Sequence, residues 1–136
     1  MSDDDGRVSR RLADLVDMVD VARGLAEKGV DAYLADDLAG RTLRLAGRQL
    51  VIQVATVAEK LPDDFKAQYP DVEWVKVQRM RNLVAHHYDR VLDEFVWETL
   101  RSSLPRLVSD LGLTPDPRRP APRVRRPGQA QGRPGS

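Results

Sequence analysis

The chain has no cysteine among its 136 residues, which excludes disulfides and thiolate metal sites. It also has no run of 18 or more apolar residues, so we expect no transmembrane helix and no membrane partner. The acidic first residues, 1–5, lack the apolar core of a secretory signal. Together these absences predict a soluble cytoplasmic protein.

Several catalytic signatures are missing as well. The sequence shows no carboxylate dyad, no glycine-rich phosphate loop and no nucleophilic serine motif. Its two histidines are neighbours, so their side chains point in different directions, and no third ligand is evident nearby. We therefore expect neither a metal site nor a cofactor.

Charge is unevenly distributed along the chain. Residues 112–136 hold six arginines and one aspartate, which gives +5 and leaves −4 for residues 1–111, since the whole chain carries +1. An acidic body is not typical of a general nucleic-acid binder. Any contact with RNA must come from a local basic patch or from the arginine-rich tail.

The helical spacing of apolar residues, together with the helix-breaking glycines and prolines, predicts an all-α fold, an antiparallel bundle of four to five helices. The expected helices cover residues 8–28, 31–35 (a turn or half-helix), 37–60, 63–68, 74–88 and a last one from about residue 93. Pro105 lies inside this last helix and should kink it. We assign residues 1–111 to the bundle, and residues 112–136, rich in proline, arginine and glycine, to a disordered tail.

The second long helix has two features of its own. Residues 50–58 are apolar nearly all round and rich in β-branched side chains, so a strand is the local rival, but no second strand is there to pair with it. Such a helix needs cover on every side, either from the core of its own protomer or from a second subunit. Arg41, Arg44 and Arg48 share one face, which we interpret as a solvated face rather than a phosphate-binding ridge.

Residues 81–88, Arg-Asn-Leu-Val-Ala-His-His-Tyr, carry the candidate chemistry. On a helix through this stretch the core side is formed by Val77, Met80 and Val84. Arg81 and His86 are five residues apart, so roughly 140° separates them. They can meet if the helix ends near residue 85, if Arg81 bends across, or if Arg81 of one subunit meets His86 of another at a two-fold axis.

The remaining polar residues of this stretch surround that pair. Asn82 lies four residues before His86, where its amide can hold one imidazole tautomer. Tyr88 lies beside the core side of the helix on the same edge as Arg81, and His87 lies on the opposite edge. His87 is the alternative catalytic histidine. An imidazole base beside an arginine phosphate clamp is the minimum for metal-free RNA cleavage by the ribose 2′-hydroxyl. Against this, an adjacent histidine pair near a helix end is more often structural than catalytic.

The stretch 81–88 resembles the signature of HEPN-domain ribonucleases, an arginine followed after four to six residues by a histidine. With Tyr88 two residues after His86, it is similar to the HepT toxins, and residues 69–74, 96–97 and 104–107 resemble the same family's frame. One branch of that family carries Gly-Glu in the central helix, where this chain has Ala55-Thr56.

The resemblance implies a dimeric helical bundle with metal-independent endoribonuclease activity and no cofactor. Arg81 and His86 would be the catalytic pair, with Asn82 and His87 shaping the site. The expected partners are RNA, a second copy of the chain, and an MntA-like nucleotidyltransferase antitoxin that transfers AMP to Tyr88. A bulky anionic group there would repel an RNA backbone.

Two other functions compete with the ribonuclease hypothesis. The acidic body and the apolar second helix also suit a non-catalytic helical dimerisation module that binds a nucleotidyltransferase. The arginine tail could tether RNA, in which case truncation after Leu111 would weaken binding and flatten its salt dependence.

Overall fold

The computed structural model describes residues 3–86 and 90–113, and within these ranges all regular structure is helical. The elements in chain order are α1 (Asp3–Glu27), α2 (Val30–Tyr33), α3 (Leu38–Glu59), α4 (Asp63–Ala67), α5 (Trp74–His86), α6 (Arg90–Glu98), the π-helical turn η1 (Thr99–Ser103) and α7 (Leu104–Asp110). The predicted all-α architecture is confirmed, and the predicted helix bounds agree with the observed ones within a few residues, except that α1 begins five residues earlier.

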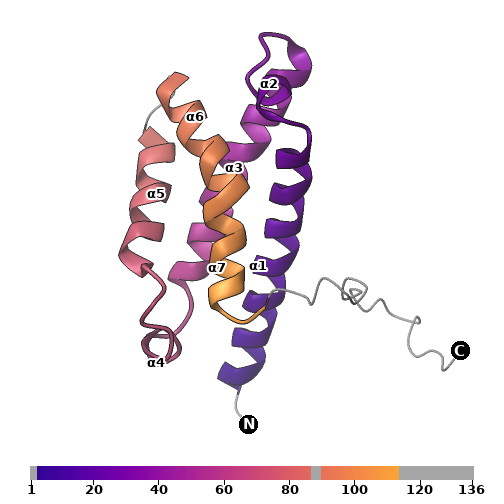
Figure 1. Cartoon of the computed structure of the whole chain (residues 1–136). Helices are drawn as coiled ribbons and strands as arrows, with labels where there is room; N and C mark the ends of the chain where they lie inside the picture. Colours follow the sequence, from indigo (N-terminus) through magenta and orange to yellow (C-terminus); the bar gives the residue numbers. More distant parts are fainter. Residues whose placement is uncertain (1–2, 87–89, 114–136) are drawn as a thin grey trace, which may run out of the picture.

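Four long rods run up and down the molecule: α1, α3, α5 and the continuous unit α6–η1–α7 (Figure 1). Helix α3 contacts every other rod, with α1 and α5 as its main neighbours. The core between the rods is made of aliphatic side chains that are at most 2% exposed: Leu15, Val19, Ala22, Val51, Val54, Ala55, Ala58, Leu61, Val84, Val96, Leu100, Leu104 and Val108. This arrangement leaves one flank of α5 open to solvent.

Helix α3 forms because it is capped at its start and covered in its middle. The Asp37 carboxylate accepts a hydrogen bond from the Gly40 amide at 2.7 Å, which supplies the N-cap. The apolar stretch 50–58 is helical, so the rival strand is excluded, and the core of the same protomer covers most of it. Leu38 and Leu45, nearer the start of the helix, remain 78% and 60% exposed and lie on the outer face of α3.

Gly47 lets Tyr33 enter the bundle. A Cβ atom at position 47 would overlap the Tyr33 hydroxyl and lie 2.8 Å from Leu100 Cδ1. Tyr33 is completely buried, and its ring centroid lies 5.3 Å from that of Trp97. The Tyr33 side chain, at the end of α2, thereby packs between α3 and the last rod.

The last rod widens into the π-helical turn η1 just before Pro105, the position of the predicted kink. Proline has no N–H to donate to the carbonyl four residues earlier, which belongs to Arg101 within η1. A single π-helical turn inside an α-helix is one way in which the interrupted ladder of hydrogen bonds is accommodated. The predicted inner face of this rod is confirmed, since Val96, Leu100 and Leu104 are all buried.

Helix α7 ends at Asp110, and Gly112, at φ 73°, follows it in the left-handed conformation that terminates many helices. The predicted disordered tail lies, from residue 114 onward, outside the described residues, and its boundary stays a prediction. None of the helices described combines the length and apolarity that crossing a bilayer requires.

Candidate functional site

Helix α5 presents the candidate motif, and the turn before it fixes where the helix begins. Trp74 donates from its indole Nε1 to the Tyr69 carbonyl at 3.3 Å, and Val72 between them is buried. Pro70 keeps the residue before it away from helical angles. The helix then runs unbroken from Trp74 to His86. The predicted core side is confirmed, since Val77, Met80 and Val84 are buried.

Arg81 reaches across to α3 rather than along its own helix. Its Nη1 lies 3.1 Å from Oε1 of Glu59, the last residue of α3, in an ion pair whose side chains are 37% and 49% exposed. An ion pair this exposed contributes less than about 1 kcal/mol to stability. The guanidinium is therefore held beside α3 by a weak contact that another anion can replace.

His86 is the last residue of α5, and its side chain is exposed to solvent. Asn82, one turn earlier, is also exposed, and the predicted hydrogen bond between the two side chains is not made. His87, the alternative catalytic histidine, and Tyr88 lie outside the described residues.

The unbroken helix bears on one of the three ways of bringing Arg81 and His86 together, the early helix end. Because α5 stays helical through His86, the histidine does not swing round before that position, and roughly 140° separates the two residues. Arg81 is held in an ion pair with Glu59 of α3. An early helix end that would turn the histidine toward Arg81 is therefore absent, and the meeting of two subunits stays a prediction.

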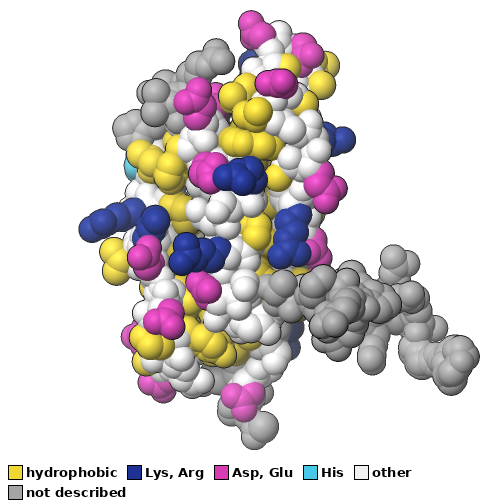
Figure 2. All heavy atoms as spheres, in the orientation of Figure 1, with side chains coloured by type: hydrophobic (Ala, Val, Ile, Leu, Met, Phe, Trp, Pro, Cys, Tyr) yellow, Lys and Arg dark blue, Asp and Glu magenta, His cyan; other side chains and the backbone are white. Residues whose placement is uncertain are grey.

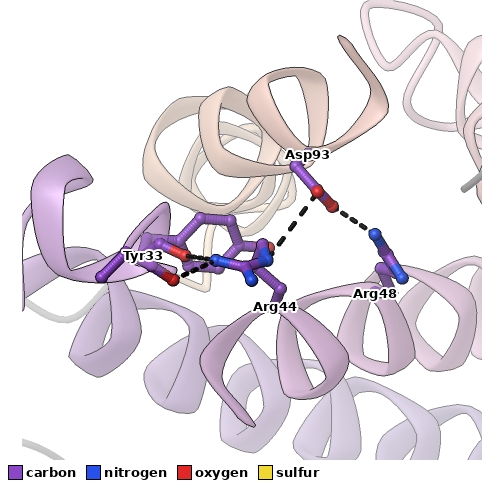
Figure 3. A network of polar contacts seen from close by, with 5 residues as sticks. Tyr33, Arg44, Arg48 and Asp93 are labelled. Carbon is purple, nitrogen blue, oxygen red and sulfur yellow. Dashed lines mark hydrogen bonds and ion pairs between the residues drawn. The ribbon is translucent and has the colours of Figure 1, made fainter. Parts of the chain in front are cut away.

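The predicted solvated arginine face of α3 is wrong for two of its three members (Figure 3). Arg48 Nη2 contacts Asp93 Oδ1 at 2.5 Å, and Arg44 Nε lies 3.8 Å from Asp93 Oδ2, with all three side chains no more than 16% exposed. Arg44 also donates to the carbonyls of Tyr33 and Ala35 at 2.9 and 2.8 Å. Arg41 alone is exposed as predicted.

This network joins α3 to the first turn of α6, directly after the candidate motif. A carboxylate is favoured in the first turn of a helix, where Asp93 lies. Burial raises the pKa of the Tyr33 hydroxyl beside it, and the charge of Asp93 adds to the rise, whereas Arg48 and Arg44 oppose it. The arginines therefore hold the start of α6 in place, and they are not available as a phosphate-binding ridge.

Two acidic residues that matter here were missed from the sequence. One branch of the HepT family carries a glutamate at the position of Thr56. Glu59 lies one turn after Thr56 and therefore on the same side of α3. Thr56 itself donates its hydroxyl to the Ile52 carbonyl at 2.8 Å. The spacing of Glu59 from Thr56 was the available signal, whereas Asp93 gave none, because its partner Arg48 is 45 residues away in sequence.

Comparison with known proteins points to ribonucleases. A family model described as "Ribonuclease HepT-like" matches residues 16–111. "Putative RNase MJ0127" of Methanocaldococcus jannaschii is 25% identical over 100 residues, 74% of this chain and 77% of that protein. "Probable ribonuclease HepT" of Thermococcus cleftensis is 30% identical over 54 residues, 40% of this chain and 49% of that protein. No solved structure matches the chain.

Proposed function

The chain belongs to the HepT-like ribonuclease family, and we propose that it is the toxin of a toxin–antitoxin pair, a metal-independent endoribonuclease with Arg81 and His86 as its catalytic residues. The observation that carries the proposal is the geometry of α5. One unbroken helix bears both side chains on different sides, and Glu59 draws Arg81 toward α3. A site that needs both groups at one phosphate is therefore completed by a second protomer.

The outer face of α3 offers a surface for that second protomer. Leu38, Leu45 and Ile52 follow one another at intervals of seven residues, and the next residue in the series is Glu59, the partner of Arg81. The two leucines are among the most exposed large apolar side chains described. A two-fold contact along this line would cover them and bring the two copies of Arg81 close to the contact.

The chemistry follows from the two groups. The imidazole of His86 takes the proton of a ribose 2′-hydroxyl, whose oxygen attacks the adjacent phosphorus. The guanidinium of the partner's Arg81 stabilises the negative charge that develops on the phosphate oxygens. The bond to the 5′-oxygen breaks, and that oxygen takes up a proton from solvent water. The products are a 2′,3′-cyclic phosphate and a free 5′-hydroxyl.

Regulation is proposed at Tyr88, two residues after His86. An MntA-like nucleotidyltransferase antitoxin would transfer AMP to its hydroxyl. The added group carries negative charge and bulk next to His86, where an RNA backbone has to bind, so it would block the site by repulsion as well as by size.

A complementation experiment tests the active site and its shared nature together. Wild-type protein should cut single-stranded RNA in EDTA, and Arg81→Ala and His86→Ala should each abolish cleavage while leaving the circular dichroism spectrum unchanged. Mixing the two inactive variants and letting subunits exchange should restore about a quarter of the wild-type activity, because half of the dimers then contain one complete site of two.

Three outcomes would contradict the proposal. Equal cleavage by the wild type and both variants would remove Arg81 and His86 from the mechanism. Loss of activity in each variant without recovery in the mixture would place the site within one protomer. A dimer that cuts no RNA and copurifies with a nucleotidyltransferase would favour the non-catalytic dimerisation module.

A further inference from the structure

A hollow of about 520 Å³ lies on the open flank of α5, between that helix and α6. Its apolar lining comes from Val75, Met80 and Leu83 of α5 and from the ring of Phe95 on α6. On the α5 side of the face shown in Figure 2, hydrophobic and cationic side chains lie close together, with carboxylates among them. Since α3 packs on another side of α5, this hollow is separate from the contact between Arg81 and Glu59.

Arg79, on the rim of this hollow, differs from the other cations of α5. Lys76 lies 3.6 Å from Glu73, and Arg81 lies 3.1 Å from Glu59. Arg79 is exposed and forms no ion pair with any described residue. Its guanidinium is therefore the one on α5 that can bind an anion without first losing a protein partner.

Arg79 also shares a side of α5 with His86. Seven residues separate them, which is two helical turns, or about 10 Å along the axis, with only roughly 20° of rotation between the two side chains. Leu83, from the lining of the hollow, lies between them in sequence. The proposed base, an apolar hollow and an unpaired guanidinium thus follow one another along one flank of α5.

We propose that this flank is a nucleotide subsite for single-stranded RNA. Arg79 binds the phosphate of a nucleotide next to the one that is cut, and the base of that nucleotide enters the hollow and stacks on Phe95. Proteins that bind single strands combine cations along the backbone with aromatic rings that receive bases, which is the combination found here. The inference rests on the proposed ribonuclease function and extends it from the reacting groups to substrate binding.

A second hollow, of about 210 Å³ between α5 and α7, does not suit the same ligand. Three carboxylates, Asp71, Glu73 and Asp110, lie on its wall and outnumber the two cations, whereas Glu73 is the one carboxylate in the lining of the first hollow, against two cations. Those cations already face two of the carboxylates at 3.6 and 4.0 Å. A phosphate is repelled there, so the subsite is assigned to the hollow beside Arg79.

The test measures binding of a 2′-O-methyl RNA oligonucleotide, which cannot be cut, by fluorescence anisotropy between 50 and 200 mM salt. Arg79→Gln should weaken binding several-fold and reduce the slope of log affinity against log salt by about 0.7, the value for one phosphate contact on a single strand. Arg101→Gln is the matched control, because it removes the same charge from an exposed arginine that is paired with Glu98 and lies outside the hollow.

Phe95→Leu keeps the apolar bulk and removes the aromatic ring. It should weaken binding about fivefold without changing the salt slope, since stacking contributes about 1–3 kcal/mol per base. The loss should disappear with an oligonucleotide that lacks the base at the bound position. Sedimentation of the same variant should still show the oligomer of the wild type.

The subsite is overturned if the wild type does not bind the oligonucleotide, or if Arg79→Gln has no larger effect than Arg101→Gln. It is also overturned if Phe95→Leu dissociates the oligomer and leaves RNA affinity unchanged, because the hollow is then a contact between subunits. Cleavage in EDTA reports separately on the proposed function. A wild type that cuts RNA together with an unaffected Arg79→Gln would refute the subsite alone.

Discussion

Replacing Gly47 by alanine tests how tightly the bundle closes around Tyr33. The new methyl group would overlap the Tyr33 hydroxyl and lie 2.8 Å from Leu100 Cδ1, whereas unstrained carbon contacts lie at about 3.5–4.0 Å. Tyr33 has no free space to retreat into, because it is fully buried and packs on Trp97. The strain must therefore be taken up by the backbone of α2 or α3.

The expected cost follows from two opposing contributions. Overpacking a filled core costs about 1–3 kcal/mol, and two close contacts place Gly47→Ala near the upper end of that range. Alanine in a helix interior gains up to about 1 kcal/mol over glycine. The free energy of unfolding should therefore fall by about 2 kcal/mol. Gly24→Ala in α1, where nothing lies within 4 Å of the new methyl group, should instead raise it by up to about 1 kcal/mol.

Urea unfolding followed by circular dichroism measures both variants on the same scale. The two midpoints should move in opposite directions at an unchanged m-value. Tyr33→Phe in the Gly47→Ala background removes the overlapping hydroxyl and should recover part of the loss. If Gly47→Ala were as stable as Gly24→Ala, the packing of Tyr33 against α3 described here would be refuted.

Three further substitutions test the polar contacts. Asp93→Asn should lower the free energy of unfolding by about 3 kcal/mol in urea, because it leaves two largely buried guanidiniums without their carboxylate; an unchanged midpoint would contradict this. The raised pKa of Tyr33 adds stability that is complete below pH about 10 and falls as the pH rises toward the folded-state value, since only the unfolded state then releases the proton. Tyr33→Phe should therefore flatten the alkaline stability curve, and parallel curves would argue against it. Glu59→Gln should tighten binding of uncleavable RNA severalfold while changing the unfolding free energy by less than about 1 kcal/mol, because the exposed pair competes with phosphate for Arg81; weaker binding would show instead that Glu59 positions the guanidinium.

The positions of the helices were predictable because they depend on local sequence patterns, namely the spacing of apolar residues and the capping residues. The periodic apolar residues of α5 and α7 locate their buried faces, and Asp37 marks the start of α3 through its cap. The apolar stretch 50–58 was ambiguous on local grounds, and the absence of any partner strand resolved it correctly. The frame of the site therefore follows from the sequence alone.

Partners across the bundle were not predictable, because they depend on how the rods turn toward one another. Arg44 and Arg48 have the spacing of a solvated face, yet Asp93 on another helix makes them part of the interior. Glu59 and Arg81 are 22 residues apart, and no periodicity relates them. The helical period alone indicated that Arg81 and His86 diverge along one helix, but it identified no surface of a second protomer that would bring them together.

The ion pairs also explain how an acidic body can belong to a ribonuclease. Residues 1–111 carry a net charge of −4, and the cations at positions 44, 48, 76, 81, 101 and 106 each face a carboxylate in the structure. Such pairs cancel much of the long-range attraction for an RNA backbone, because opposite charges a few ångströms apart present little net field. Binding then depends on a few local contacts, and the open flank of α5, with Arg79 in no ion pair with a described residue and His86 exposed, offers two of them.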